Sequence, residues 1–96
     1  MRTIKQLITN EKEVYILMKS KAIQYRFMSD AEWEGITYGD GANATDRPVQ
    51  FMMILRPDGT LRFLGWSGYM YFEHNRNNVL CIDYEKYIDG FENYYA

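Results

Sequence analysis

The chain has 96 residues, of which 47% are hydrophobic and 25% charged, which allows one compact domain over residues 1–96 and leaves no room for a second. Eleven Lys and Arg against 13 Asp and Glu give a net charge of -2, which argues against a general electrostatic grip on nucleic acid. The single cysteine excludes an internal disulfide and cysteine-rich zinc sites. The sequence also shows no signal peptide and no apolar run long enough to span a membrane, so we expect a cytoplasmic protein without membrane attachment.

Residues 3–18 predict a short helix followed by a buried strand. Thr3 can cap two helical turns in which the apolar side chains share one face, and the charged residues 11–13 end that helix. The next five residues, Val14–Met18, are β-branched, aromatic or long apolar residues. This run is typical of a central strand that is buried on both faces of a sheet.

The longest predicted helix covers residues 20–34. Its apolar residues also alternate as in a strand, but the flanks favour a helix. Ser20 is a good N-cap, Gly35 suits the left-handed position after a helix, and no Gly or Pro lies between them. We expect residues 36–38 to form a short strand and residues 39–48, which are rich in loop formers, to form the one substantial loop.

The chain from residue 49 onward is predicted to be mainly sheet. Alternating apolar residues over 49–55 and their return over 61–64 predict a hairpin that is joined by a tight Pro-Asp-Gly turn. The two glycines within 65–68 are expected to bend or break the chain before a further strand at 69–72. A polar turn is expected at 74–78.

The last predicted elements are an apolar strand at 79–82 and a C-terminal helix. Asp83 is the predicted N-cap of this helix, because aromatic and aliphatic residues recur at helical spacing from Tyr84 to Tyr95. Gly90 within it costs about 1 kcal/mol relative to alanine, so the helix needs to pack on the sheet to persist. Together the elements predict an α+β fold, a small single domain with a mostly antiparallel sheet, one long helix (about 20–34) and a C-terminal helix packed on the sheet.

Three stretches of the chain resemble a recurring pattern in small proteins of phages and mobile elements from Firmicutes. In the first, Glu34–Gly41, a helix ends in Gly and is followed by an apolar, a polar and an aromatic residue and a Gly-containing loop. The other two are Asp58–Trp66 and Ile82–Ile88, so the resemblance touches much of the chain after residue 14. The resemblance implies that this protein belongs among the accessory gene products with which mobile elements manage their hosts. Small inhibitors of CRISPR nucleases and restriction enzymes are common among those products.

The chain offers few groups for catalysis. His74, its only imidazole, lies in a polar predicted turn, and Cys81 lies in an apolar run that would bury its thiol, unlike an activated nucleophile. The loop after residue 39 has Ala42 and Ala44 where a calcium loop needs oxygen ligands, and Ser67 has no glycine two residues after it, as a nucleophile elbow requires. We therefore expect a protein that is not an enzyme, with no catalytic residue, no metal and no cofactor.

Aromatic residues and acidic segments together indicate a binding surface. Nine Tyr, five Phe and two Trp exceed what a domain of this size buries easily, and Tyr and Trp often anchor interfaces. Residues 29–46 and 83–96 are rich in carboxylates, which either solvate helix faces or complement the basic groove of a nucleic-acid enzyme. On the second interpretation, the expected partner-binding residues are Asp83, Glu85, Tyr87, Asp89, Glu92, Tyr94, Tyr95, Glu32, Glu34 and Asp40.

The sequence thus predicts a non-enzymatic protein-binding module of a phage or mobile element, such as an anti-CRISPR or anti-restriction inhibitor that occupies a host nuclease. A homodimer would use the same surface. Two alternatives stay open, of which one is a protein that binds a small nucleotide signal in a pocket closed by the 39–47 loop. The other is an RNA or single-stranded DNA binding protein that stacks bases on rings beside arginines, with Arg56, Arg62, Trp66, Tyr69 and Tyr71 as its contacts.

Overall fold

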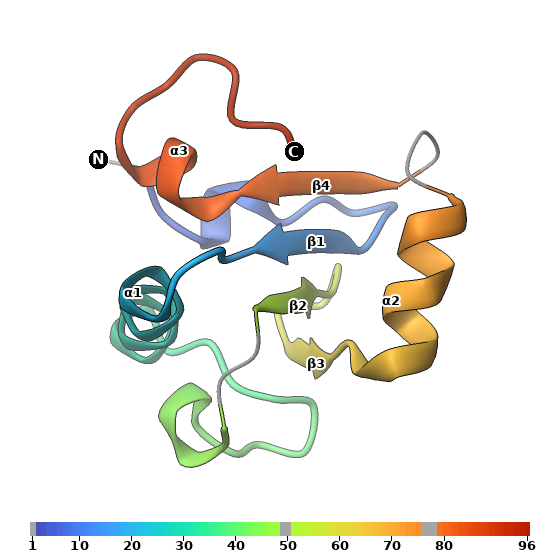
Figure 1. The fold of residues 1–96 in the computed structure, drawn as a ribbon. Helices are drawn as coiled ribbons and strands as arrows, with labels where there is room; N and C mark the ends of the chain where they lie inside the picture. The colour runs from blue at the N-terminus through green and yellow to red at the C-terminus, as the bar shows by residue number, and fades with distance from the viewer. Residues whose placement is uncertain (1, 49–50, 76–78) are drawn as a thin grey trace.

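A mixed sheet of four strands in the order β3-β2-β1-β4 forms the centre of the molecule (Figure 1). Its central strand β1 (Val14–Leu17) pairs antiparallel with β2 (Met52–Leu55) and parallel with β4 (Leu80–Asp83). At one edge, β3 (Leu61–Phe63) pairs antiparallel with β2. The α+β class is therefore confirmed, as is the central position of the first strand.

The computed structural model describes residues 2–48, 51–75 and 79–96, and at 65–67 it describes the backbone alone. The first two residues of the predicted strand at 49–55 lie outside the described residues. The same is true of residues 76–78 of the predicted turn.

Helices cover both faces of the sheet, so β1, β2 and β4 each contribute to two cores (Figure 1). Val14 and Ile16 point into the larger core, which they share with α1 (Lys21–Trp33) and α3 (Tyr84–Ile88). On the other face, the ring of Tyr15 stacks on Phe72 of α2 (Gly65–His74) at 5.5 Å in a smaller core. Because neither face meets water, all four residues of β2 are buried and no polar alternation remains.

The helix predicted between residues 20 and 34 is α1. The Ser20 hydroxyl accepts a hydrogen bond from the Ile23 N–H at 3.3 Å, and Gly35 ends the helix with a φ of 76°. Phe27 and Ala31, one turn apart, are fully buried against the sheet. Larger residues than alanine at position 31 would therefore force α1 away from the sheet.

The predicted hairpin is confirmed, with Gly59 at a φ of 86° in its turn and the Arg56 N–H bonded to the Thr60 carbonyl at 2.8 Å. The loop at 39–48 is also present and holds one 3-10 turn, η2 (Ala44–Asp46). The two helical turns predicted at the N-terminus are wrong in length, because only the 3-10 turn η1 (Lys5–Leu7) forms. The strand predicted at 36–38 is reduced to isolated bridges, one between Tyr38 and Leu61 of β3 and one between Thr37 and Asn43 of the following loop.

The bend at 65–68 and the strand at 69–72 are wrong, because this segment is the ten-residue helix α2. The molecule thus has a second helix of substantial length beside α1. Leu64 and Phe72 lie eight positions apart and both enter the smaller core, which is helical spacing. Gly68 lies within this helix without breaking it. A Cβ at this position would come within 3.0 Å of Leu64 Cδ1, so the small size of glycine gives Leu64 room to pack.

The C-terminal helix predicted to reach Tyr95 is also wrong in extent. Asp83 does cap it, accepting the Lys86 N–H at 3.3 Å, but α3 ends at Ile88 and Gly90 takes a φ of 86°. The chain then returns along β4, where the Asp83 N–H bonds to the Tyr94 carbonyl at 2.7 Å and the Ala96 N–H to the Cys81 carbonyl at 3.0 Å. These bonds satisfy backbone groups at the sheet edge, which a longer helix would leave open.

Candidate functional site

Two of the predicted partner-binding residues are used inside the fold. Asp83 is only 5% exposed, where it caps α3 and forms an ion pair with Lys19 at 3.4 Å. Tyr87 is 3% exposed, and its hydroxyl donates a hydrogen bond to the Thr3 carbonyl at 2.6 Å. Neither side chain is available to a partner without unfolding part of the domain.

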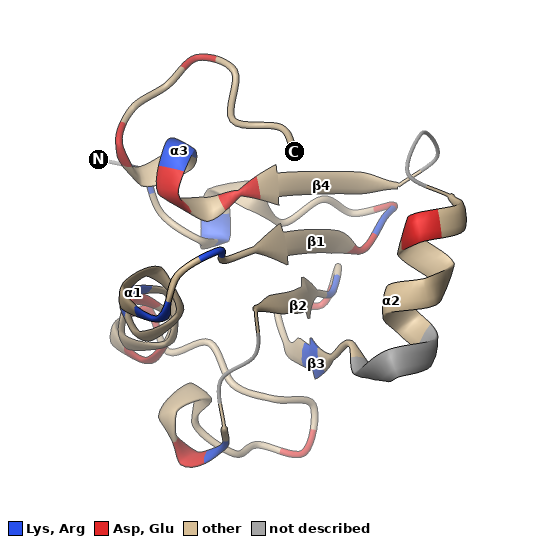
Figure 2. Ribbon diagram, viewed as in Figure 1, with Lys and Arg blue, Asp and Glu red and all other residues tan. Residues whose placement is uncertain are grey.

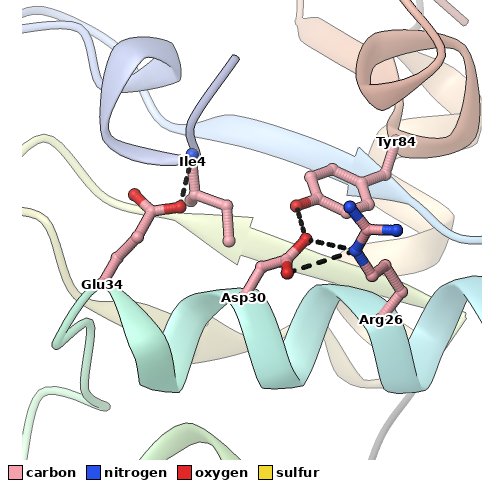
Figure 3. Close-up of polar contacts among 5 residues, drawn as sticks. All are labelled: Ile4, Arg26, Asp30, Glu34 and Tyr84. Atoms are coloured by element: carbon pink, nitrogen blue, oxygen red, sulfur yellow. Dashed lines mark hydrogen bonds and ion pairs between the residues drawn. The ribbon is translucent and has the colours of Figure 1, made fainter. Parts of the chain in front are cut away.

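Glu34 also has a structural partner (Figure 3). Its two carboxylate oxygens accept the backbone N–H groups of Ile4 at 2.8 Å and Lys5 at 2.9 Å, so the side chain caps η1 from the end of α1. Nearby on the same helix, Asp30 accepts the Tyr84 hydroxyl at 2.6 Å. These contacts tie the N-terminus and α3 to α1, and they fix the position of everything that follows α3.

Glu32 and Asp40 fasten the 39–48 loop. Glu32 accepts the Thr45 hydroxyl at 2.8 Å, and Asp40 forms an ion pair with Arg47. The hydrogen bond from Arg47 holds the pKa of the Asp40 carboxyl below its ordinary value. Both carboxylates remain exposed but already have partners on the loop, so they are weak candidates for binding a second protein.

Tyr94 belongs to an aromatic cluster that the sequence did not reveal. Its ring meets Tyr87 edge to face at 5.0 Å, and the guanidinium carbon of Arg2 lies 5.0 Å from its centroid. Arg2 also donates hydrogen bonds to the carbonyls of Tyr87 at 3.0 Å and Phe91 at 2.7 Å. The arginine thereby clamps the segment that follows α3 onto the body of the domain.

The remaining predicted residues, Glu85, Asp89, Glu92 and Tyr95, are exposed and lie on α3 and the segment after it, where Figure 2 shows the acidic positions in red. Glu85, Asp89 and Glu92 form no ion pair with any described residue. Two aromatic rings, Phe91 and Tyr95, are each 54% exposed among these carboxylates. We call this set, Glu85, Asp89, Phe91, Glu92 and Tyr95, the C-terminal surface.

Trp33, at the end of α1, is the most exposed large hydrophobic residue described, at 91%. It lines a groove of about 660 Å³ that also includes Arg2, Ile88 and Gly90, so the end of α1 meets the end of α3 here. Sequence reasoning missed this residue, although a signal was present. Trp33 lies two positions after the buried Ala31 and therefore falls off the buried stripe of the helix.

The residues expected to stack nucleic-acid bases are not arranged as a platform. Tyr69 and Tyr71 lie two positions apart on a helix, so they face different directions, and Tyr69 packs against the smaller core. Arg62 is held by Glu13 at 3.0 Å, and Arg56 is half-buried beside Gly39. The side chain of Trp66 lies outside the described residues. The strand on which this alternative depended is absent from the described part of the chain.

His74 and Cys81 lie on different elements of the described structure, α2 and β4. Over residues 2–48, 51–75 and 79–96, no three His, Cys, Asp or Glu side chains form a group that could hold a metal ion. Cys81 is buried at 4% exposure in the smaller core, and His74 is exposed at the end of α2. Within these same ranges, no helix has the length and apolar character needed to cross a bilayer.

Neither a family model, nor a curated protein, nor a solved structure matches the chain.

Proposed function

We propose that this protein is a non-catalytic binding module that docks its C-terminal surface and Trp33 on a basic surface of another protein. The observation that carries the proposal is the contrast between two groups of residues. Asp83, Tyr87 and Glu34 make contacts that hold the fold together. By contrast, the carboxylates of Glu85, Asp89 and Glu92 are exposed and form no ion pair with a described residue. Three large aromatic side chains are also exposed, namely Trp33, Phe91 and Tyr95. Aromatic anchors surrounded by like charges are typical of interfaces with an oppositely charged partner.

The position of Asp89 supports a role outside folding. Asp89 is the C-cap of α3, where the exposed carbonyls of the helix end make a nearby carboxylate unfavourable. Trp33, at 91% exposure, likewise gains almost nothing from burial in the isolated domain, and Phe91 leaves 54% of its surface exposed. Residues that cost stability without a structural benefit are expected where a surface has been kept for binding.

For the partner, we propose a bacterial host protein with a basic groove, such as a nuclease of a defence system. A groove that binds nucleic acid is lined with Lys and Arg, and the exposed carboxylates on α3 would compete with phosphates for it. The resemblance to small proteins of phages and mobile elements supports the same class of partner. The single cysteine of the chain supports a cytoplasmic location for this encounter.

A second copy of the chain is a poorer partner for this surface. A two-fold interface would place Glu85, Asp89 and Glu92 against the same residues of the other copy. Facing like charges in an interface costs free energy. We therefore propose a hetero-complex rather than a homodimer through the C-terminal surface.

The proposal is tested by affinity capture of the tagged protein from a nuclease-treated lysate of a Firmicutes host. The test variant combines Asp89→Lys and Phe91→Ala, both at exposed positions of the C-terminal surface. The control variant combines Glu73→Lys and Tyr71→Ala on α2, which makes the same changes of charge and ring on the opposite side of the sheet. Far-ultraviolet circular dichroism of all three proteins shows whether each is folded.

The proposal expects one stoichiometric host protein bound to the wild type and to the control but lost from the test variant. It also expects that protein to have a basic groove and to lose nuclease or DNA-binding activity in the complex. Capture that survives in the test variant, or no captured protein at all, contradicts the proposal.

A further inference from the structure

A second hollow of the surface lies away from the C-terminal surface, between α1 and the 39–48 loop. Its volume is about 570 Å³, within the range of small-molecule sites. One wall is a single stripe of α1, because its residues recur at intervals of three and four, and the other wall is the end of the loop. The lining residues are Lys21, Gln24, Tyr25, Met28, Ser29, Thr45, Arg47 and Pro48.

The loop wall of this pocket is held firmly in place. Ala44 is fully buried in the larger core, and Thr45 is bonded to Glu32 of α1 at 2.8 Å. Asn43 and Asp46 bond reciprocally at the start of η2. This wall of the pocket is therefore preformed, so ligand binding would cost little conformational entropy for ordering the loop.

The charged side chains that line the pocket are both positive, although the chain as a whole is acidic. Lys21 is exposed and forms no ion pair with a described residue. Arg47 uses Nη2 to bond Asp40, and its guanidinium carbon lies 4.7 Å from the Tyr38 centroid. These contacts orient the guanidinium, and no hydrogen bond to a described residue uses its Nε or Nη1, which suits an anion with several oxygen atoms, such as a phosphate.

The pocket also presents an aromatic ring. Tyr25 lies one helical turn after Lys21 and is 63% exposed, so one face of the ring is open to a ligand. Met28 lies on the same stripe but is only 3% exposed, so it offers a ligand little surface, whereas the exposed Ser29 adds a hydroxyl. A planar heterocycle that stacks on Tyr25 would thus have its attached phosphates within the region of Lys21 and Arg47.

We propose that this pocket binds a nucleoside phosphate, with the base stacked on Tyr25 and the phosphates between Lys21 and Arg47. This function goes beyond the docking of the C-terminal surface and uses a different part of α1. The 39–48 loop provides the wall with Arg47, and Asp40 positions that arginine for the ligand.

The test is isothermal titration calorimetry of the full chain with ADP and GDP, beside adenosine, guanosine and pyrophosphate. We expect at least one diphosphate to bind about tenfold more tightly than its nucleoside and than pyrophosphate, because only the intact ligand uses both the ring and the cations. Tyr25→Ala and Lys21→Glu should each weaken that binding by about tenfold, and Tyr25→Phe should restore it. Both positions are exposed, so the variants are expected to fold.

Lys12→Glu and Tyr71→Ala provide the matched control, because this lysine and tyrosine line another shallow hollow on a different face. We expect both to leave the affinity unchanged. Three results would overturn the proposal: no saturable binding of either diphosphate below about 1 mM, equal binding by the Tyr25→Ala variant, or pyrophosphate binding as tightly as the nucleotides. Tighter binding of a ten-residue oligothymidine that ignores Tyr25→Ala would also overturn it in favour of a nucleic-acid site.

Discussion

The hydroxyl of Tyr84 donates a hydrogen bond of 2.6 Å to Oδ2 of Asp30, and this contact joins the first residue of α3 to α1 (Figure 3). Arg26 holds the same carboxylate from the preceding turn at 3.0 Å. The aromatic ring itself is buried and meets Phe27 edge to face at 5.0 Å. Tyr84 thus positions α3 on α1, together with the bond from Tyr87 to Thr3 and the bonds from Arg2 to the segment after α3.

The Tyr84→Phe variant should lose stability while keeping the fold. It removes the hydrogen bond to a partly buried carboxylate but keeps the ring in the larger core, so we expect a loss of about 1.5 to 2 kcal/mol. Urea denaturation measures the difference. Tyr25→Phe, at an exposed position of α1, is the control and should leave the urea midpoint unchanged. Equal midpoints for Tyr84→Phe and the wild type would show that the bond to Asp30 contributes nothing.

Tyr84 should also make the protein sensitive to alkali. Burial and then the hydrogen bond to Asp30 raise the pKa of Tyr84 above its ordinary value of 10.0. A pKa that is higher in the folded state gives stability that is complete below pH 10.0 and is lost as the pH rises towards the folded value. The free energy of unfolding should therefore fall more steeply above pH 10.0 in the wild type than in Tyr84→Phe. Parallel curves would contradict this assignment.

Glu34 should be more important for stability than an exposed glutamate. Glu34→Ala leaves the N–H groups of Ile4 and Lys5 without their acceptor, which should cost about 1 to 2 kcal/mol. Glu34→Gln keeps one acceptor oxygen and should recover part of the loss. The exposed Glu11 provides the control, since Glu11→Ala should have almost no effect in the same urea titration. A larger loss for Glu11→Ala than for Glu34→Ala would contradict the capping role.

Asp40 should make the 39–48 loop sensitive to acid. The hydrogen bond from Arg47 lowers the pKa of Asp40 from its ordinary value of 3.8. A pKa that is lower in the folded state contributes stability above pH 3.8, and this contribution is lost as the pH falls through the folded value. The urea midpoint of the wild type should exceed that of Asp40→Asn near neutral pH, and the two should converge in acid. A difference that persists or grows in acid would contradict the ion pair.

Local signals predicted much of the fold. Ser20 and Gly35 mark the ends of α1, and the Pro-Asp-Gly turn marks the hairpin, because caps and turns depend on a few neighbouring residues. The prediction for residues 65–72 was wrong, because the structure of this segment depends on contacts with distant residues. Its glycines and β-favouring tyrosines predict a broken strand, yet contacts with distant strands place Leu64 and Phe72 on one face of a helix.

The candidate site was predicted only in part, because composition does not show which carboxylates the fold uses. Glu34 looks like a surface acid in the sequence, but its carboxylate accepts backbone N–H groups of η1, and Asp83, predicted both as a cap and as a partner-binding residue, is only 5% exposed. Phe91 belongs to the predicted helical stripe that reaches Tyr95, but α3 ends at Ile88 and Gly90 takes a φ of 86°. Such outcomes depend on long-range contacts that no local pattern encodes.

The most direct test of the binding proposal is photocrosslinking from within the C-terminal surface. A benzophenone amino acid is placed at position 91 in one protein and at position 71 on α2 in another, and each is irradiated in host lysate. We predict a covalent adduct with one host protein from position 91, none from position 71, and loss of the adduct when Asp89→Lys is added. The absence of a protein adduct at position 91, or the same adduct from position 71, would contradict the account.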